Sequence, residues 1–423
     1  MNKKLFIIFL VVISVFIVGS IGIKANSEKI LLLSDNIVSG GPAPDGIPPI
    51  EEPNYITIEE ADEKLEPEDA VFLFRSEDQI YVYPQRIMVW HEIVNEEIEG
   101  RKVSITYCPL TGSAIAYLGE VLGTETTFGT SGKLVNSNLI MYDRETDSYW
   151  PQIYGRAITG DITGEKLERV PLYWTQWQLI KDNFSKAKVL SRETGVSRNY
   201  DRDPYGSYIE NGSPGNYYSN QRLVFNVINE DSRLERKDIV IAGEYDEFPF
   251  AIIKDEIKEN QEISFVINNG RLTAKYIETL NTVEIYDENG EEVVAFDVMW
   301  FAWYAFFPET ELIDNDNDLV SETSEPREIV VDMLNFYFEP SEIQVEPGEE
   351  VTFIVNNPST AFHTFTIYHS RTDRTDPIVN ISLSGGGQEQ VTVTMPEEEK
   401  TLYLVCLPHE GIDMVGSVIV VNP

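Results

Sequence analysis

Cysteine, histidine and positive charge are all scarce in this chain of 423 residues. Two cysteines, Cys108 and Cys406, allow at most one disulfide, which excludes a small scaffold stapled by several bridges. Lys and Arg total 32 against 71 Asp and Glu, and the formal net charge of -39 would repel a polyanion. We therefore expect no nucleic-acid partner, and we expect protein partners to present basic docking surfaces.

Long hydrophobic runs are rare as well. Residues 5–23 form an uncharged run that is long enough to cross a bilayer as a helix, and Lys3 and Lys4 precede it. The poor cleavage signal Ile23-Lys24-Ala25 favours a retained anchor over a removed leader. Residues 1–26 are therefore predicted to be a signal anchor or a signal peptide. The rest of the chain is then expected in the cell envelope, outside the cytoplasmic membrane, either anchored through this helix or secreted.

Residues 27–56 are rich in residues that interrupt regular structure. Gly40-Gly41-Pro42 and Pro48-Pro49 are typical of extended chain and turns rather than of packed helices or strands. This segment is predicted to be an extended tether between the N-terminal segment and the first domain.

Residues 57–308 are predicted to form a sheet-rich α+β domain. Short runs of β-branched and aromatic residues recur between Gly, Asp and Asn turns, including residues 70–74, 79–83, 103–107, 115–117, 139–142 and 239–241. Helices are few, and two helix starts are indicated by the capping-box spacings of Thr57 with Glu60 and of Thr175 with Gln178.

This domain contains a weak internal similarity. Asp69-Ala70-Val71 followed by Tyr83-Pro84 is similar to Asp238-Ile239-Val240 followed by Phe248-Pro249. Either a hairpin is duplicated, or two strands of similar composition match by chance. The sequence leaves both explanations open.

Residues 309–328 are predicted to be an acidic linker. They are polar and charged, with few large apolar side chains, so they repel one another and stay extended. Calcium binding is the alternative for residues 314–318, where Asp and Asn alternate. That run lacks the glycine and the distal bidentate glutamate of a calcium loop, so we favour the linker.

Residues 329–423 show a regular strand rhythm. Strand-like segments alternate with turns such as Asn356-Asn357-Pro358 and Gly385-Gly386-Gly387, which predicts a Greek-key β-sandwich. The predicted fold class is therefore mainly β: a large sheet-rich α+β domain followed by a C-terminal sandwich.

Four residues of this sandwich have the chemistry of a metal site. Cys406 ends a predicted strand, His409 and Met414 lie on the following loop, and His363 precedes another strand. A thiolate, two imidazoles and a thioether suit copper as both Cu(II) and Cu(I), which permits transfer of single electrons. Each residue alone is more often structural, so a metal-free sandwich is the alternative.

The Cys-x2-His-x4-Met spacing, the aromatic strand before it and the Met-x-Gly exit resemble the cupredoxin, or blue-copper, family. The similarity is closest to its plastocyanin and amicyanin group and covers residues 329–423. It implies a cupredoxin-like fold with one type 1 copper held by His363, Cys406, His409 and Met414. The pattern departs at Thr364, where many relatives have an asparagine that braces the ligand loop.

The first domain offers weaker candidates. His91 and Glu92 stand together, and Cys108 follows a strand at a turn that contains Pro109 and Gly112, where nucleophiles and ligands are often presented. One interpretation makes these three residues a second metal or thiol site lined by Trp150 and Gln152. The other makes His91 a bridge between core elements and Cys108 an inert buried thiol.

Segments of this domain resemble an exported archaeal and bacterial family of unknown function. The matching motifs are Trp-His-Glu-Ile-Val-Asn at 90–95, Tyr-Cys-Pro-Leu-Thr-Gly-Ser-Ala at 107–114 and Phe-Gly-Thr-Ser-Gly-Lys-Leu at 128–134. Some relatives have a second cysteine where this chain has Thr111, so the sequence supports no dithiol mechanism. The resemblance implies no particular reaction.

The leading hypothesis is an exported, membrane-tethered type 1 copper protein that exchanges single electrons with a redox partner. A copper-binding or copper-delivery protein is the alternative, as is an exported oxidoreductase whose first domain is served by the copper domain. Whether the chain is an enzyme stays open, and electron transfer is favoured over catalysis on a substrate of its own.

Overall fold

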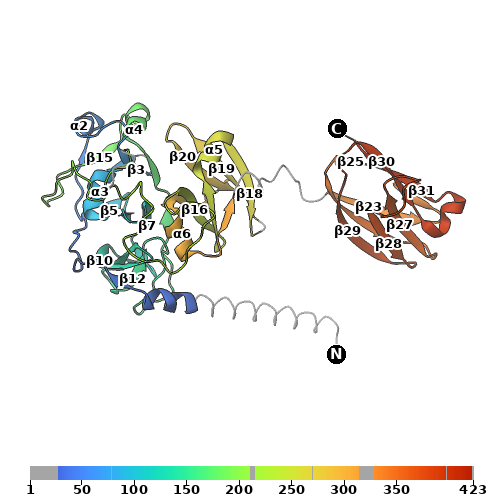
Figure 1. Ribbon diagram of the computed structural model, residues 1–423, viewed down its shortest axis with the longest axis horizontal. Helices are drawn as coiled ribbons and strands as arrows, with labels where there is room; N and C mark the ends of the chain where they lie inside the picture. The colour runs from blue at the N-terminus through green and yellow to red at the C-terminus, as the bar shows by residue number, and fades with distance from the viewer. Residues whose placement is uncertain are drawn as a thin grey trace. The chain divides into compact units, whose positions relative to one another are not determined.

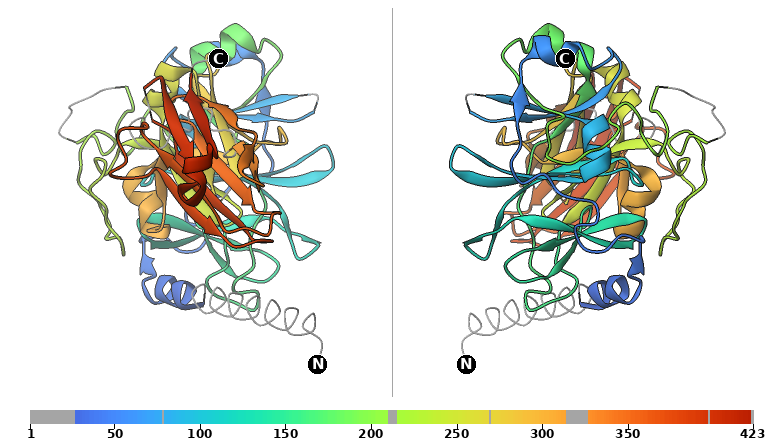
Figure 2. Two further views of the ribbon diagram at one scale, coloured as in Figure 1. Left: turned by 90° about the vertical axis from the view of Figure 1, so that its right-hand side faces the viewer. Right: turned by 90° about the vertical axis from the view of Figure 1, so that its left-hand side faces the viewer.

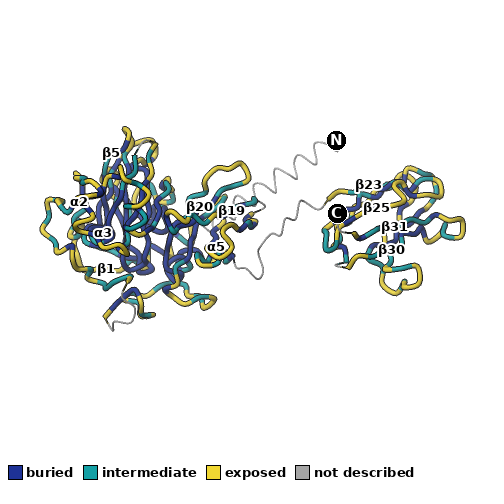
Figure 3. The backbone as a smooth tube through the Cα atoms, turned by 90° about the horizontal axis from the view of Figure 1, so that it is seen from above, coloured by how far each residue is buried: buried dark blue, intermediate teal, exposed yellow. Residues whose placement is uncertain are grey.

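A computed structural model describes residues 27–77, 79–209, 215–268, 270–313, 327–396 and 398–421 of the chain (Figure 1). The chain divides into two compact units, with the boundary between Leu319 and Val320. Strands predominate in both, and buried residues are concentrated inside each unit (Figure 3). The prediction of a mainly β chain, with a large sheet-rich domain followed by a β-sandwich, is confirmed.

The first unit contains several small antiparallel and mixed sheets. One has the order β13-β7-β6-β5, formed by Arg169–Val170, Ser113–Leu118, Arg101–Cys108 and Ile93–Ile98. A second has the order β14-β3-β4-β15-β2, formed by Tyr173–Gln176, Ala70–Arg75, Ile80–Pro84, Lys188–Leu190 and Tyr55–Ile56. A third has the order β1-β10-β11-β12, formed by Val38–Ser39, Phe128–Val135, Asn138–Asp143 and Tyr149–Pro151.

The remaining sheets of this unit lie later in the chain, apart from the short pair β8 (Glu120–Val121) and β9 (Thr124–Glu125). One has the order β21-β16-β17-β22, formed by Ala295–Met299, Ile239–Tyr245, Phe248–Ile253 and Glu311–Ile313. The other is the meander β18-β19-β20, formed by Glu262–Ile267, Gly270–Ile277 and Thr282–Asp287. The helices are α2 (Ile58–Asp62), α3 (Gln85–His91), α4 (Trp177–Asn183), α5 (Lys254–Asn260) and α6 (Trp300–Phe306).

One of the two predicted capping boxes is present. The N–H of Glu60 donates to the Thr57 hydroxyl and the N–H of Thr57 donates to the Glu60 carboxylate, which satisfies both donors at the start of α2. The second prediction is wrong in detail, because α4 has Gln176 as its N-cap and no side chain caps it. Thr175 is the last but one residue of β14, where it pairs with Val71, and its buried hydroxyl has no hydrogen-bond partner among the described residues.

The internal similarity is a repeat of a whole structural unit. Hairpin β3–β4 is followed by α3, and hairpin β16–β17 is followed by α5. In each repeat one strand, β14 or β21, pairs antiparallel with the first hairpin strand, and another, β15 or β22, pairs parallel with the second. We call residues 66–190 the first repeat and residues 235–313 the second repeat.

Asp69 and Asp238 occupy equivalent positions in the two repeats. The N–H of Trp177 donates to the Asp69 carbonyl and the N–H of Trp300 donates to the Asp238 carbonyl, both at 2.9 Å. Both carboxylates also accept a backbone N–H from three residues earlier, again at 2.9 Å. Chance similarity of strands does not reproduce such contacts, so the duplication hypothesis is confirmed.

The proline part of the similarity is not equivalent. Pro84 pairs with Val71 at the end of its hairpin that joins α3, whereas Pro249 pairs with Glu244 near the hairpin turn. In structural register, Gln85 at the start of α3 therefore matches Lys254 at the start of α5, because each follows its aspartate by the same distance in the chain.

The prediction of a tether over residues 27–56 is wrong. Residues 27–35 are helical and lie beside the sheet of β10–β12, where Ile30 and Leu33 join the hydrophobic core (Figures 1 and 2). The N–H of Gly40 donates to the Gly132 carbonyl at 2.8 Å, so the backbone around the glycines is held by β10. Prolines and glycines here shape turns over a neighbouring sheet, because apolar residues between them can be buried.

The predicted linker over residues 309–328 is also too long. Glu311–Ile313 forms β22, with Ile313 fully buried, and Arg327 already belongs to the first strand of the second unit. Residues 314–326, which include the alternative calcium run, lie outside the described residues.

The predicted anchor, residues 1–26, lies outside the described residues too. Within the part of the chain that is described, no helix combines the length and the apolar character that crossing a bilayer requires.

The second unit is a sandwich of two mixed sheets. One has the order β24-β23-β26-β29, formed by Tyr337–Glu339, Arg327–Leu334, Glu350–Asn356 and Gln388–Thr394. The other has the order β25-β31-β30-β27-β28, formed by Glu342–Val345, Val415–Val420, Lys400–Val405, His363–Tyr368 and Val379–Leu383. Alternating side chains of both sheets fill one core, in which the rings of Phe353 and Phe365 lie 5.4 Å apart across the sandwich.

Leu33 tests whether residues 27–35 are part of the folded unit. Leu33→Ala removes a buried side chain and should lower the free energy of unfolding by about 2–4 kcal/mol. Leu31→Ala in the same helix is the matched control, because Leu31 is 60% exposed and should change stability by less than about 0.5 kcal/mol. Urea unfolding followed by tryptophan fluorescence measures both. Equal changes in the free energy of unfolding for the two substitutions would favour the prediction of an extended tether.

Candidate metal centre

The loop that joins β30 to β31, residues 406–414, is closed on itself. It contains the 3-10 helix η1 (Leu407–Ile412). The N–H of His409 donates to the Cys406 carbonyl at 3.0 Å, the N–H of Met414 to the His409 carbonyl at 3.2 Å, and the N–H of Cys406 to the Met414 carbonyl at 3.1 Å. Backbone hydrogen bonds therefore fix these three side-chain positions relative to one another.

Strand pairing brings His363 to this loop. His363 is the first residue of β27, which pairs antiparallel with β30 so that Thr366 lies opposite Val405. Continuing this register places the start of β27 beside the residue that follows β30, which is Cys406. The sheet thus joins residues that are far apart in the sequence.

Three ligand atoms converge at this point. The Cys406 Sγ lies 3.5 Å from the His363 Nδ1 and 3.3 Å from the His409 Nδ1, and the two Nδ1 atoms lie 3.1 Å apart. One ion inside this triangle could contact all three atoms at bond lengths of about 2 Å. Among the described residues, this is the group of histidine, cysteine and acidic side chains that is compact enough to hold a metal ion.

Two of the three candidate ligands are shielded from solvent. His363 and Cys406 are fully buried, and the His363 Nε2 has no hydrogen-bond partner among the described residues. Burial, with the nearby His409 second, lowers the pKa of His363, which favours the neutral imidazole that a metal requires. Two imidazole nitrogens and a thiol sulfur that face one another at these distances are a donor set that fits copper.

Thr364 takes the place of the expected asparagine and still braces the loop. Its hydroxyl accepts the N–H of Leu407, the residue after Cys406, at 2.8 Å. Its own N–H points at the Cys406 Sγ at 3.4 Å. The departure from the family pattern therefore keeps a side chain to backbone bond between β27 and the ligand loop.

A second brace was missed by sequence reasoning. Arg374 forms two parallel bonds to the Glu410 carboxylate, at 2.9 and 2.7 Å, and the Tyr403 hydroxyl donates to the same carboxylate at 3.0 Å. The Arg374 bonds are the main reason that the pKa of Glu410 is lowered to about 2. Glu410 follows His409 directly, so this contact holds the exposed part of the loop to β30.

Apolar side chains surround the outer edge of the site. The ring of Phe336 lies 5.0 Å from that of His409 and 6.3 Å from that of His363. His409 is partly exposed, and several large hydrophobic residues near it in the sequence or in space are exposed, namely Phe336, Phe362, Leu407 and Ile412. This exposure is the kind of surface on which another protein docks.

The candidates of the first unit are not assembled into a similar group. The His91 Nδ1 contacts the Pro48 carbonyl and its Nε2 contacts the Tyr200 hydroxyl, both at 2.7 Å. A carbonyl only accepts, so Nδ1 carries the proton and Nε2 accepts from Tyr200. Both ring nitrogens are engaged, and His91 bridges two segments that pack on α3.

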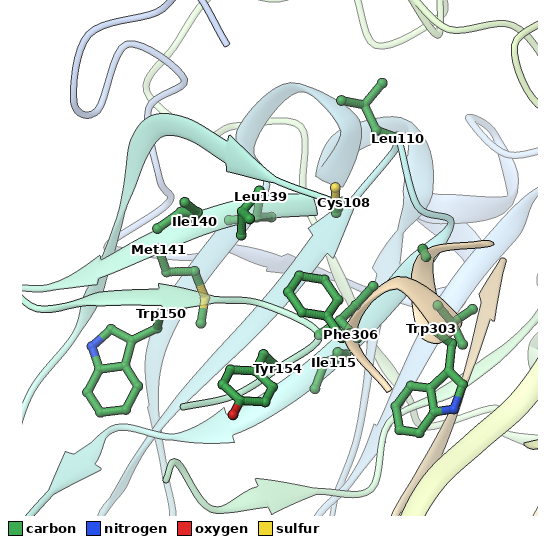
Figure 4. Close-up of a cluster of buried hydrophobic side chains, with 14 of the residues drawn as sticks. Cys108, Leu110, Ile115, Leu139, Ile140, Met141, Trp150, Tyr154, Trp303 and Phe306 are labelled. Atoms are coloured by element: carbon green, nitrogen blue, oxygen red, sulfur yellow. The ribbon is translucent and has the colours of Figure 1, made fainter. Parts of the chain in front are cut away.

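Cys108 lies in the hydrophobic core. Figure 4 shows it in the cluster that contains Leu110, Leu139 and Trp150. Burial, and secondly the charge of Glu92, raises the pKa of Cys108 to about 11, so the thiol is protonated at neutral pH. Both cysteines of the chain are free thiols.

Glu92 is the most unusual of these residues. It ends α3 in a left-handed conformation with φ of 60° and is 9% exposed. Burial alone raises its pKa to about 8. The unfolded chain releases this proton at a lower pH than the folded protein does. The free energy of unfolding therefore falls as pH rises above the ordinary pKa of a glutamate.

Trp150 and Gln152 serve hydrogen-bond networks of the core. The Trp150 Nε1 donates to the Asp143 carboxylate at 2.9 Å. The Gln152 amide donates to the Thr106 hydroxyl at 3.0 Å, and its carbonyl accepts from Ser113 at 2.7 Å. Every one of these contacts lies within the protein, so neither residue points to a ligand.

Comparison with known proteins separates the two units. Residues 44–310 match the model of the family described as a protein of unknown function (DUF3179), and the chain belongs to this family. Residues 327–421 match the model of copper binding proteins of the plastocyanin/azurin family. The second unit is therefore a cupredoxin domain, its cofactor is copper, and the cluster of His363, Cys406 and His409 fits a type 1 site.

Solved structures similar to the chain include small copper proteins. The reduced auracyanin of Roseiflexus castenholzii is 23% identical, with 23% of this chain and 100% of that chain covered and a TM-score of 0.21. Auracyanin A of Chloroflexus aurantiacus is 20% identical, with coverages of 23% and 99% and a TM-score of 0.21. A purple cupredoxin of Nitrosopumilus maritimus is 20% identical, with coverages of 22% and 99% and a TM-score of 0.18. No curated protein matches the sequence significantly.

Glu410→Gln tests the brace of the ligand loop. Arg374 and Glu410 lie at the surface, so losing their ion pair should lower the stability of the domain only slightly. The pKa of Glu410 is lowered by folding, so this difference should be full above its ordinary pKa and should disappear as pH falls towards about 2. Urea unfolding of the metal-free protein followed by circular dichroism measures it, and Glu389→Gln, at an exposed carboxylate of β29, is the control. A difference that persists unchanged at pH 2 would contradict the ion pair.

Glu92→Gln tests the buried acid. Folding raises the pKa of Glu92. Between the ordinary pKa of a glutamate and about pH 8, the folded state therefore holds a proton that the unfolded state has already released. Wild-type stability should fall across this range, and Glu92→Gln should remove that loss and stabilise the protein by up to about 5 kcal/mol above pH 8. Below pH 4 the two proteins should be equally stable. Denaturant unfolding at pH 4, 6 and 9 measures this, and a stabilisation that does not depend on pH would contradict the shifted pKa.

Proposed function

We propose that the protein is an exported, envelope-tethered type 1 copper protein that transfers single electrons to or from a redox partner. The observation that carries the proposal is the convergence of two imidazole nitrogens and a thiol sulfur within 3.5 Å. Copper bound there supplies a one-electron couple between Cu(II) and Cu(I). The activity of the DUF3179 unit is not part of this proposal.

The residues have distinct roles in this proposal. His363, Cys406 and His409 would hold the metal, and Met414 would supply the weak axial contact. Met414 is fully buried and its backbone is bonded to both Cys406 and His409, which supports a fixed position next to them. The hydrogen bonds of Thr364 and Glu410 would limit movement of the ligands when the charge of the site changes.

Partner contact would occur where the site approaches the surface. His409 is the partly exposed member of the cluster, and the apolar side chains of Phe336, Leu407 and Ile412 lie exposed around the same loop. The net charge of -39 favours a partner with a basic docking surface and attracts it over a distance. Residues 1–26 would anchor the chain so that both units face away from the cytoplasm.

Electron transfer and copper delivery differ in whether the metal is retained. Repeated reduction by ascorbate and reoxidation by ferricyanide, with an excess of a copper chelator present, should leave the blue band and the bound copper unchanged over many cycles. The burial of His363 and Cys406 supports retention. Loss of copper to the chelator during cycling would favour delivery.

Cys406→Ser should abolish the intense blue charge-transfer band, because the band arises from the thiolate bond to copper. The visible spectrum of the copper-loaded protein measures this. Cys108→Ser is the matched control, since that thiol lies in the other unit and the band should persist. An unchanged band in Cys406→Ser would sink the copper assignment.

Met414→Leu should leave copper bound and raise the reduction potential, because removal of a weak axial donor disfavours Cu(II) more than Cu(I). Redox titration followed by absorbance measures the shift. Met395→Leu, another buried methionine of the sandwich core, is the control and should leave the potential unchanged. A potential that is unchanged or lower in Met414→Leu would argue against the axial role.

A further inference from the structure

Each repeat of the first unit carries a cleft beside the helix that follows its hairpin. The cleft of the first repeat has a volume of about 460 Å³ and is lined by Gln85 and Arg86, at the start of α3. The cleft of the second repeat has about 270 Å³ and is lined by Lys254 and Asp255, at the start of α5. Tyr208 lines both clefts. The structural register of the two repeats allows equivalent positions beside the two helices to be compared.

An ion pair of the protein itself lines the second cleft. The Lys254 Nζ lies 2.9 Å from the Asp297 carboxylate, and both side chains are largely buried. In the first repeat the equivalent residues are Gln85 and Trp174, because Trp174 precedes Trp177 as Asp297 precedes Trp300. Neither carries a charge, so the first repeat has no ion pair between these positions, and its cleft is the larger of the two.

The floor of the first cleft is a buried polar network with one free acceptor. Gln85 is 5% exposed, and its Nε2 donates to the Asp203 carboxylate at 2.8 Å and to the Tyr107 hydroxyl at 3.1 Å. The Tyr218 hydroxyl donates to the same carboxylate at 2.9 Å, and the hydroxyls of Tyr107 and Tyr208 lie 3.0 Å apart. No hydrogen bond to the Gln85 Oε1 is formed within the described residues, and Gln85 lines the cleft, so this acceptor is open to a ligand or to water.

The walls of this cleft offer balanced charge. The Arg86 guanidinium is bound by Asp69 at 2.9 and 2.6 Å, and Asp201 is bound by Arg192 at 2.7 Å. The Arg202 guanidinium makes no ion pair with any described residue and is available as a donor. Paired charges do not select an ion, and a lining of Asp, Arg, Gln, Asn and Ser does not select an apolar ligand.

We propose that the cleft of the first repeat binds a neutral polyhydroxylated ligand, a mono- or disaccharide. Sugar hydroxyls both donate and accept, so one ligand could satisfy the Gln85 carbonyl and the Arg202 guanidinium together. The ring of Tyr208 supplies an aromatic surface in the lining, and the volume falls within the range of small-ligand sites. The segment Asp201-Arg202-Asp203 supplies three lining residues.

Isothermal titration of the full-length, copper-loaded protein tests this. The probes are glucose, galactose, mannose, N-acetylglucosamine, maltose and cellobiose, with citrate and glycine betaine as charged comparators. At least one saccharide should bind with one site per chain. Arg202→Ala and Gln85→Met should each weaken that binding about tenfold or more, because each removes a hydrogen bond to the ligand.

Arg198→Ala is the matched control, since this half-buried arginine lies on the same segment but outside the cleft, and it should leave the affinity unchanged. If Gln85→Met fails to fold, the exposed Arg202 decides the result by itself. Absence of saccharide binding up to about 10 mM overturns the proposal. Binding that survives Arg202→Ala, or stronger binding of citrate or glycine betaine than of any saccharide, overturns it as well.

Discussion

Three electron-rich atoms held within 3.5 Å of one another are the constraint on which the second unit depends. The hydrophobic core of the sandwich, which contains Cys406 and Met414, packs around these atoms. The closed ligand loop, the Thr364 hydroxyl and the Glu410 carboxylate each hold one part of the arrangement in place. A site fixed in this way changes little in shape when its charge changes by one electron, which is what fast electron transfer requires.

The first unit, by contrast, is built from two repeats of one structural unit. Two hairpins, each followed by a short helix and completed by one antiparallel and one parallel strand, provide two equivalent scaffolds. The second retains the buried Lys254 and Asp297 pair, whereas the first has Gln85 and Trp174 there and a larger cleft. Duplication leaves one copy free to diverge, because the other copy and the shared core continue to stabilise the unit. The candidate residues His91, Cys108, Trp150 and Gln152 all belong to that core or brace it.

Much of the copper site could be predicted because its chemistry is local in the sequence. Cys406, His409 and Met414 stand within one loop. His363 begins a strand that follows the recognisable turn Asn356-Asn357-Pro358. The bracing contacts could not be predicted in the same way. Arg374 reaches Glu410 from a loop 36 positions earlier, and no spacing rule identifies that pair. The segment of residues 27–56 was misjudged for a similar reason, since prolines and glycines look alike in a free tether and in turns that lie over β10.

The sequence by itself determined the mainly β character, the two-unit organisation and three side chains that the structure brings together, His363, Cys406 and His409. Composition, turn spacing and residue type carry that information, and none of it depends on distant parts of the chain. Only the tertiary structure decided which polar residues are satisfied within the core and which face a cleft. It also decided that a weak similarity around Asp69 and Asp238 is a repeat of a whole unit. Burial, pairing register and the partners of a side chain arise from residues brought together by folding, and a linear pattern does not contain them.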